Sequence, residues 1–340
     1  WDQDLIYKGH KIVPYCPRCG TALSSHEVAQ GYKTVKERSA VVRFKCVDED
    51  AYFLAWTTTP WTLPSNVALC LNPNDEYSKV KACDGYTYYM ATALLDSVLG
   101  ALAKDGEKAY EILESYKGTD LAGRSYVALY QGAADEAAKQ KKKAHYTVCD
   151  EYVTMEDGTG IVHIAPAFGE DDARVGRDND LPMVQFVDTR GNLTEETPFA
   201  GKFVKDADPE VLKDLDARSL LFSAPKFEHE YPFCWRCDTP LIYFARSTWF
   251  IAMSKKRDEL LKSNNMVNWM PETIRDGRMG DFLRNVIDWG ISRERYWGTP
   301  LPVWECECGH RHCIGSIEEL KSMSDDCPDD IELHKPYVDN

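Results

Sequence analysis

Alternating apolar and polar positions mark several strands in the first half of the chain. The stretches 39–47 and 51–58 are rich in β-branched and aromatic residues, which is typical of strands. The stretch 76–91 keeps this pattern on both sides of an Asp84-Gly85 pair, so it predicts a hairpin that turns there. Two short apolar runs, 161–167 and 181–188, are candidates for buried strands.

Helical spacing of apolar residues governs other stretches. It predicts helices over 92–104 and over 107–118, and Gly118 is expected to end the second. A short acidic helix is expected from about 169 to 178. The Asp-Pro pair that opens "DPEVLKDLDARSLLF" (208–222) is expected to cap another helix, and "AMSKKRD" at 252–258 is interpreted as a helix start.

Strands with helices placed irregularly between them predict an α+β fold, a barrel-like sheet with peripheral helices. The 340 residues, 44% of them hydrophobic, suffice for two or three domains. No apolar run approaches the ~20 residues of a membrane span, so no membrane partner is expected. The net charge of −15 argues against a strongly basic nucleic-acid binder, although a local basic path remains compatible with it. The chain starts at Trp1 without a visible signal peptide and stops in "HKPYVDN", so we expect a piece of a longer protein.

One phrase occurs twice. "PYCPRCGTAL" at 14–23 returns as "PFCWRCDTPL" at 232–241, with six of ten letters identical. A CxxC turn presents two thiolates to one centre, and tetrahedral zinc needs four such ligands. We therefore expect Cys16, Cys19, Cys234 and Cys237 to share one zinc ion. Two separate metal-free knuckles, or pairing with partners outside the chain, are the alternatives.

A shared ion has a topological consequence. The segment between the knuckles would leave one point and return to it, as in a domain inserted through a zinc-clamped neck. The predicted divisions are 1–31 (neck and first knuckle), 32–222 (inserted domain), 223–245 (second knuckle and return strand) and 246–340 (helical return segment). CxxC pairs among only twelve cysteines suggest a reducing compartment. The cysteines that stand alone are expected to be unreactive: Cys46, Cys70, Cys83, Cys149 and Cys327.

The stretch "WTTTPWTLPSN", 56–66, carries clustered hydroxyl groups. Three threonines end a strand that Pro60 and Pro64 prevent from continuing. Their side chains cannot all enter one core because strand residues alternate faces, so some hydroxyls need polar partners or a ligand. Threonine as a good strand former explains the stretch equally well.

The stretch "GTGIVHIAPAFGEDDARVG", 158–176, places a histidine on a strand and carboxylates at a helix start. A lone His163 between apolar neighbours is more often a satisfied core residue than a catalyst. The acidic run 170–172 needs only the helix macrodipole as its explanation. Each signal is weak alone, but both lie in the same predicted inserted domain.

Together these stretches resemble the isoleucyl-tRNA synthetases, a class I aminoacyl-tRNA synthetase family. "WTTTPWTLPSN" and "GTGIVHIAPAFGEDD" resemble its two editing motifs, and "DWGISRERYWGTPLP" (288–302) resembles the segment that re-enters its catalytic domain. The valyl and leucyl enzymes carry "TTRP" where this chain has "TTTP", which favours the isoleucine member. No HIGH-type sequence for ATP is found, and "AMSKKRD" lacks the order of the family's KMSKS loop.

The resemblance implies an editing region that hydrolyses valine misattached to tRNA(Ile), releasing valine and tRNA. It implies zinc as cofactor, with ATP and Mg²⁺ only in the full-length enzyme, and a cytoplasmic monomer. The terminal ribose and a water would be held by Thr57, Thr58, Thr59 and Asn66. Substrate would also meet Trp56, Thr62, His163 (blocking the extra methyl of isoleucine) and Asp172 (binding the α-ammonium group). A non-catalytic zinc-ribbon module that binds tRNA or protein, and an editing domain of valyl or leucyl type, are the alternative functions.

Two further clusters are weaker candidates. The basic run "KQKKKAH" offers Lys139, Lys141, Lys142 and Lys143 to tRNA phosphates, although a solvated loop explains it slightly better. Cys306 and Cys308 in "WECECGHRHCIG" would form half of a second zinc site, or a local site completed by His312 or Cys313.

Overall fold

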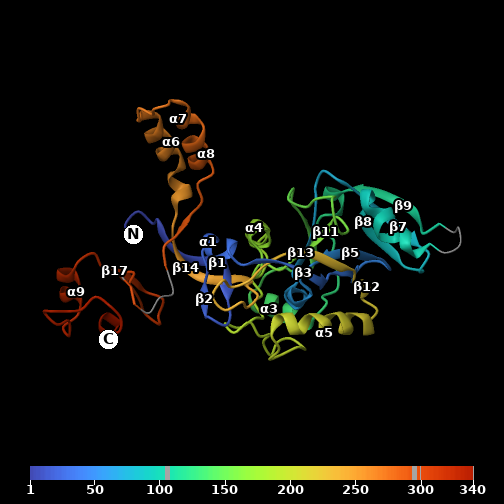
Figure 1. The fold of residues 1–340 in the computed structure, drawn as a ribbon, viewed down its shortest axis with the longest axis horizontal. Helices are drawn as coiled ribbons and strands as arrows, with labels where there is room; N and C mark the ends of the chain where they lie inside the picture. The colour runs from blue at the N-terminus through green and yellow to red at the C-terminus, as the bar shows by residue number, and fades with distance from the viewer. Residues whose placement is uncertain (104–107, 293–296, 299, 340) are drawn as a thin grey trace. The chain divides into compact units, whose positions relative to one another are not determined.

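The computed structural model describes residues 1–103, 108–292, 297–298 and 300–339. It divides into two compact units, one formed by Ile12–Ala245 and the other by Trp1–Lys11 with Arg246–Asn340 (Figure 1). Within the motif at 288–302, residues 293–296 and 299 lie outside the described residues.

A large mixed sheet forms the centre of the 12–245 unit. Its order is β10-β6-β11-β5-β8-β7-β9, with β4 beside β5 and β12 beside β4. The strands are β4 (Ala40–Lys45), β5 (Tyr52–Thr57), β6 (Ala68–Leu71), β7 (Glu76–Ala82), β8 (Thr87–Ala91), β9 (Tyr110–Lys117), β10 (Tyr146–Cys149), β11 (Ile161–Ile164) and β12 (Leu221–Ser223). The sheet curls as a half-barrel with helices around it, which confirms the α+β fold.

Both faces of the sheet are covered where β6 and β11 pair. Leu69 and Leu71 enter the larger core cluster, whereas Ala68 and Cys70 enter a smaller one. This alternation is the two-residue period of a strand. It distributes the residues of β11 in the same way, so Val162 and His163 face opposite sides of the sheet.

The strands expected over 39–47, 51–58 and 161–167 are confirmed as β4, β5 and β11. The expected hairpin over 76–91 is also confirmed. Its two strands, β7 and β8, pair antiparallel across the predicted turn. Gly85 there has a φ of 91°, a conformation that glycine adopts without a steric penalty.

The helix expected over 107–118 is wrong, because Tyr110–Lys117 is the strand β9. This strand pairs antiparallel with β7, and most of its residues are exposed. Tyr116 packs against Tyr89 of β8, the strand on the far side of β7, at a ring-centroid distance of 6.0 Å. The unpaired edge of β7 thus decided the conformation, and pairing outweighed a local helical pattern.

The strand expected over 181–188 is also wrong. Leu181, Val184 and Phe186 are buried as predicted, in the smaller core cluster. The backbone there makes only an isolated bridge, between Val187 and Leu193. These apolar side chains fill the core from a loop. An apolar run in the sequence cannot by itself distinguish such a buried loop from a buried strand.

The helices of this unit are short except for one. They are α1 (Ser25–Ala29), η1 (Pro60–Ser65), η2 (Thr92–Leu94), α2 (Leu95–Leu99), η3 (Gly100–Leu102), η4 (Gly118–Leu121), α3 (Gln131–Lys139), α4 (Glu170–Asp178) and α5 (Val204–Ala217). The acidic helix is confirmed as α4, and the helical stretch from 92 is confirmed as three short pieces.

The longest helix, α5, corrects the expected Asp-Pro cap. It begins at Val204, so Asp208 and Pro209 lie inside it. The apolar positions Val204 and Ala207 already belong to the core, and their burial extends the helix past the predicted start. Asp208 therefore does not cap its own helix.

A two-stranded ribbon and a smaller sheet are separate from the large sheet. A ribbon pairs β3 (Tyr32–Arg38) antiparallel with β13 (Lys226–Pro232). A four-stranded sheet of order β15-β14-β1-β2 contains β1 (Ile6–Cys16), β2 (Thr21–Ala22), β14 (Ile242–Ile251) and β15 (Trp289–Gly290).

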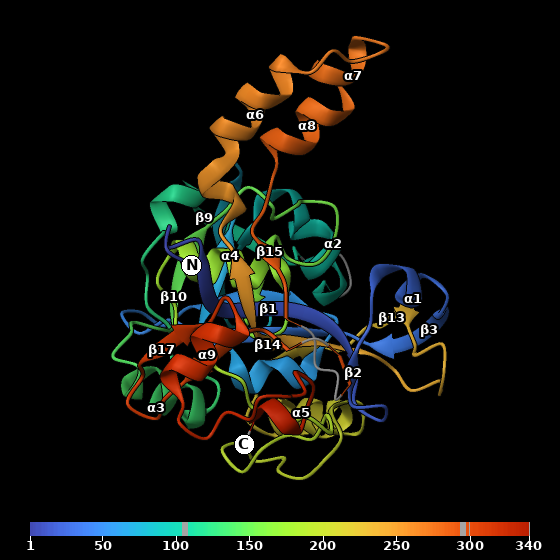
Figure 2. The ribbon, with the colours of Figure 1, turned by 90° about the vertical axis from the view of Figure 1, so that its left-hand side faces the viewer.

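The other unit is mainly helical. Its elements are η5 (Met253–Lys256), α6 (Arg257–Met266), α7 (Thr273–Asp276), α8 (Arg278–Arg284), β16 (Val303–Glu305), β17 (Arg311–Cys313), α9 (Ile317–Met323) and η6 (Tyr337–Asp339). Figure 2 shows α6 and α8 side by side, and the helix start expected at "AMSKKRD" is confirmed. Over the described part of the chain, no helix has the length and apolar character needed to cross a membrane.

Candidate functional site

A chain of hydroxyl groups runs through the threonine-rich turn. Strand β5 ends at Thr57, and the 3-10 helix η1 begins three residues later at Pro60. The Oγ1 atoms of Thr57 and Thr59 lie 3.3 Å apart, and those of Thr59 and Thr62 are also 3.3 Å apart. Thr58, between them, is half-buried. The sequence therefore brings three of its four threonines into contact by turning sharply at Pro60.

His163 lies at the end of this hydroxyl chain. Its Nε2 is 3.0 Å from Thr62 Oγ1. Thr62 donates its own proton to the Thr59 carbonyl at 2.8 Å, so the histidine Nε2–H donates to Thr62. The side chain is only 6% exposed, and burial lowers its pKa to about 4. His163 is therefore neutral near pH 7, and its buried Nδ1 lacks a partner among the described residues.

Asp172, in the first turn of α4, reaches back with its side chain to the end of β11. Its Oδ2 accepts a hydrogen bond from the backbone N–H of Ala165 at 2.9 Å. A side chain at Gly169 would meet the Asp172 carboxyl carbon at 3.1 Å, so glycine leaves room for it. Burial raises the pKa of Asp172 to about 7; the Ala165 N–H opposes this and the charge of Asp171 adds to it. A carboxyl held in this way favours a cationic partner that would restore its ionised form.

Asp171, the next carboxylate, has a different environment. Its side chain is 61% exposed and lies 3.3 Å from Arg174 one turn further along α4. Arg174 in turn pairs with Asp150 at 2.6 Å. These contacts are those of a surface helix start, as the sequence suggested for the acidic run.

Asn66 uses its side chain inside the protein. Its Oδ1 accepts from the Tyr126 hydroxyl at 2.7 Å, and its Nδ2 donates to the Ala68 carbonyl at 2.9 Å. His145 Nε2 lies 3.1 Å from the Asn66 carbonyl. The residue is 2% exposed, so its contribution to a site is to fix the course of the chain after η1.

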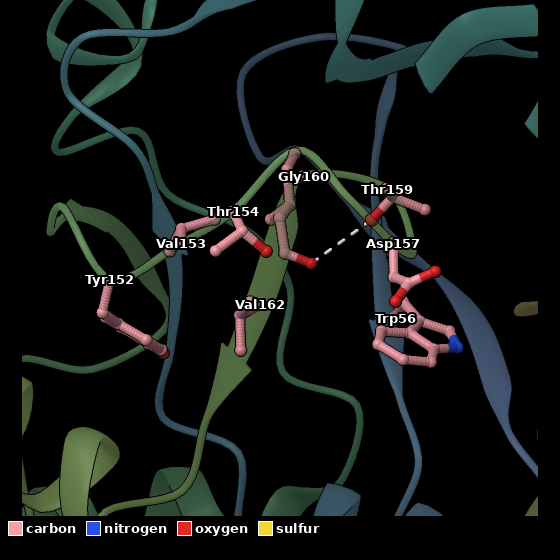
Figure 3. A pocket seen from close by; sticks show the side chains of 9 residues that line it. Trp56, Tyr152, Val153, Thr154, Asp157, Thr159, Gly160 and Val162 are labelled. Atoms are coloured by element: carbon pink, nitrogen blue, oxygen red, sulfur yellow. Dashed lines mark hydrogen bonds between the residues drawn. The ribbon is translucent and has the colours of Figure 1, made fainter. Parts of the chain in front are cut away.

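A cavity of about 240 Å³ lies beside the start of β11 and includes Trp56 from the predicted set. Figure 3 shows Trp56 and Asp157 on one side of β11, with Tyr152 and Val153 on the other. The Thr159 hydroxyl, at its rim, donates to the Ile161 carbonyl at 3.2 Å. Its lining includes Val162, whose neighbour His163 points to the opposite face of the strand. Neither His163 nor the threonines of the hydroxyl chain are among the residues that line the cavity, so the two are separate features of this region.

The sequence reasoning did not identify Asp208. Its Oδ1 accepts the backbone N–H of Trp61 at 2.8 Å, within η1. The Asp-Pro pair signalled a capping carboxylate correctly but for the wrong helix. A long-range partner of this kind leaves no local pattern in the sequence.

The two CxxC turns converge. Their four sulfur atoms all lie within 4.8 Å of one another. Cys237 Sγ is 3.5 Å from both Cys16 Sγ and Cys19 Sγ, and Cys19 Sγ is 4.0 Å from Cys234 Sγ. Tetrahedral zinc with Zn–S bonds of ~2.3 Å requires sulfurs ~3.8 Å apart, so these thiols fit a metal ion. Burial would raise the pKa of Cys237, but hydrogen bonds with Thr239 and with the other thiols lower it to about 6.

The second cysteine cluster is less complete. Cys306 Sγ and Cys308 Sγ lie 2.8 Å apart at the turn between β16 and β17, and His310 Nδ1 is 3.7 Å from Cys308. Among the described residues, only the two CxxC turns bring three or more possible metal ligands together. The second site stays a prediction.

The lysines of the basic run have partners within the chain. Lys139 lies 3.2 Å from Glu136, and Lys142 lies 2.8 Å from Asp180. Lys143 Nζ lies 4.3 Å from the centre of the Tyr146 ring, and Lys141 is exposed at a φ of 54°. These surface contacts are weak enough to exchange for others, so a tRNA contact by these lysines stays a prediction.

Known proteins match this chain over its whole length. It is 55% identical over 340 residues to isoleucine–tRNA ligase of Clostridium kluyveri, which accounts for 100% of this chain and 32% of that protein. The isoleucine–tRNA ligase of Bacillus thuringiensis is 48% identical over 342 residues, covering 99% of this chain and 32% of the relative. The chain thus spans about a third of the length of the curated relatives it matches.

Among solved structures, "GlLeuRS-CP1" covers 56% of this chain and 99% of its own, with a TM-score of 0.43 and 14% identity. The P. knowlesi cytosolic leucyl-tRNA synthetase editing domain covers 57% of this chain and 98% of its own, with a TM-score of 0.42 and 14% identity. The sequence profile described as tRNA synthetases class I (I, L, M and V) matches residues 1–337. Because that match extends over nearly the whole length, the chain belongs to the class I tRNA synthetases.

Proposed function

We propose that the 12–245 unit is the editing region of an isoleucyl-tRNA synthetase and hydrolyses the ester of valyl-tRNA(Ile) to valine and tRNA. The observation that carries this proposal is the chain of Thr57, Thr59 and Thr62 hydroxyls that ends on the buried, neutral His163. The Asp172 carboxylate at the end of the same strand supplies the second element, a group that suits an α-ammonium ion.

The chemistry explains why such a region is needed. Isoleucine and valine differ by one methylene, which a hydrophobic pocket converts into only about 1–3 kcal/mol. The isoleucyl enzyme is itself the known example of this limit, which we adopt and do not derive. A second pocket that excludes isoleucine by its size and hydrolyses valyl esters corrects the remaining errors.

In this reaction the protein needs mainly to position the water and the ester. A water adds to the ester carbonyl, the bond to the ribose oxygen breaks, and the ribose hydroxyl regains a proton. Thr57 and Thr59, with Thr58 beside them, hold the ribose and the water by hydrogen bonds. Asp172 anchors the amino acid through its ammonium group, and His163 forms the wall beside its side chain. A histidine with a pKa of about 4 is a poor base near pH 7, so we assign it a steric role.

The cavity beside the start of β11 would suit the adjoining part of the tRNA end. Trp56 offers a ring on which a base could stack, next to the polar Asp157 and Thr159. We extend the proposal to the whole protein: tRNA(Ile) as partner, ATP and Mg²⁺ bound only by the full-length ligase, and a cytoplasmic monomer.

The test is deacylation by the purified 340-residue chain. We expect valyl-tRNA(Ile) to be hydrolysed well above the protein-free rate and isoleucyl-tRNA(Ile) to remain close to it. The rate of ester loss is followed with amino acid labelled in each tRNA. Equal rates for both esters, or no rate above background, would refute the proposal.

We also propose that the four converging thiols hold one zinc ion, which would tie the two knuckles together. The Cys16→Ser, Cys234→Ser double variant removes one ligand from each knuckle. It should lose about one equivalent of zinc relative to the parent chain, as measured by elemental analysis. A Cys46→Ser, Cys70→Ser variant is the matched control, since both of those buried thiols lie outside the cluster. Full metal retention by the first variant would contradict a shared site.

A further inference from the structure

The threonine turn depends on a carboxylate from a distant part of the chain. Helix η1 begins with Pro60, which has no N–H, and Thr62 N–H already bonds to the Thr59 carbonyl at 3.0 Å. The N–H of Trp61 therefore has no partner within its own helix. It donates to Asp208 Oδ1 at 2.8 Å, across 147 residues of sequence.

Trp61 sits between the two threonines whose hydroxyls lead to His163. Fixing its backbone N–H fixes the orientation of the peptide between Thr59 and Thr62. Its ring is 4% exposed and packs edge-on against Phe168 at a centroid distance of 5.0 Å. Phe168 directly precedes the segment that carries Asp172. The same residue thus joins both halves of the site and is anchored by Asp208.

Two charged side chains, Lys205 and Glu37, influence the Asp208 carboxyl. Lys205, one turn earlier on α5, pairs with Glu37 of strand β3 at 2.8 Å, and its Nζ lies 4.0 Å from the Tyr231 ring centre. Burial raises the pKa of Asp208 to about 7, which the charge of Lys205 opposes and that of Glu37 reinforces. A carboxyl kept in such surroundings costs stability unless it makes a compensating contact.

We propose that Asp208 is a positioning residue of the editing reaction. It fixes the conformation of the Thr59–Thr62 turn by accepting the hydrogen bond from the Trp61 N–H. It touches neither substrate nor reacting atoms in this scheme. The inference rests on the proposed editing function, and one arm of its test does not depend on that function.

The first arm measures backbone order. Amide hydrogen exchange of the peptide covering 57–66 is compared between the parent chain and Asp208→Ala. The variant should exchange the Trp61 amide about tenfold faster or more, because the hydrogen bond from this amide to the Asp208 carboxyl oxygen is lost. Asp208→Asn keeps an acceptor oxygen at the same position and should retain most of the protection. Asp206→Ala, an exposed carboxylate on the same helix, is the matched control and should leave exchange unchanged.

The second arm measures hydrolysis of valyl-tRNA(Ile). Asp208→Ala should lower kcat about tenfold or more while KM changes less than about twofold, since substrate contacts remain but their geometry is lost. Asp208→Asn should recover kcat to within about threefold of the parent. Should the alanine variant fail to fold, Asp208→Glu takes its place, because it keeps the charge but displaces the acceptor by one methylene.

The outcomes separate the two proposals. Unchanged exchange at Trp61 in a folded Asp208→Ala, or equal loss of kcat in the alanine and asparagine variants, overturns the positioning role. A parent chain without any hydrolysis refutes the editing function instead, while the exchange arm still decides what Asp208 does.

Discussion

Replacing His163 with alanine is expected to raise hydrolysis of isoleucyl-tRNA relative to valyl-tRNA by about 10- to 100-fold. A packed wall resists an added methyl group at a cost of ~1–3 kcal/mol, and removing the ring removes that cost. Hydrolysis of valyl-tRNA should largely survive, because in the proposed reaction the threonine hydroxyls would hold the water and the ester. Thr62 also keeps its bond to the Thr59 carbonyl at 2.8 Å in the absence of the ring.

The measurement is the ratio of the two deacylation rates in parent and variant. A core histidine would behave differently, since its loss would lower stability and both rates together. His145→Ala is the matched control: His145 is also buried, its pKa is also lowered by burial, and it also bonds to the backbone of this unit. It should reduce both rates in proportion. An unchanged ratio in a folded His163→Ala would remove His163 from the site.

Local patterns predicted the elements that carry the chemistry. The strand before Thr57, the strand around His163 and the acidic helix of Asp172 are present where alternation and capping placed them. The convergence of the two cysteine phrases could also be predicted, because a repeated CxxC phrase indicates four thiols that could share one ion. These features depend on side-chain type and short spacing.

The errors occurred where long-range pairing decided the outcome. Residues 110–117 became a strand because the edge of β7 was available, and 181–188 stayed a loop although its apolar side chains are buried. Asp208 looked like a cap for its own helix but caps η1 instead. Tyr126 and His145, which hold Asn66 in place, carry no motif at all. Such partners become visible only when the sheet has brought distant segments together.

The Asp172 carboxylate is expected to make hydrolysis of valyl-tRNA depend on pH and on its charge. Asp172→Asn keeps the size of the side chain and an oxygen for the Ala165 N–H, but it cannot neutralise an ammonium ion. A hydrogen bond to a charged group contributes about 1.5–3 kcal/mol, so kcat/KM should fall by about 10- to 100-fold at pH 7.5. Asp171→Ala is the matched control, because that carboxylate is 61% exposed and faces Arg174. Loss of activity in Asp171→Ala but not in Asp172→Asn would show that the roles of the two residues are reversed.

The pH profile provides the second readout, and its sign follows from the raised pKa. Below about 7 the Asp172 carboxyl is mostly protonated and cannot pair with the ammonium group, whereas above it the carboxylate is available. After subtraction of the protein-free rate, kcat/KM of the parent should therefore rise between pH 6 and 7.5, where this free-enzyme group ionises. His163, with a pKa of about 4, stays neutral over this range and adds no step to the profile.

The raised pKa of Asp172 also affects stability. The protonated carboxyl favours the fold, and this contribution is lost as pH rises through about 7. Asp172→Asn should flatten the activity profile and should be more stable than the parent at pH 8, with the difference shrinking toward pH 4. A parent profile that is already flat, or a variant that keeps the same rise, would exclude Asp172 as the titrating group.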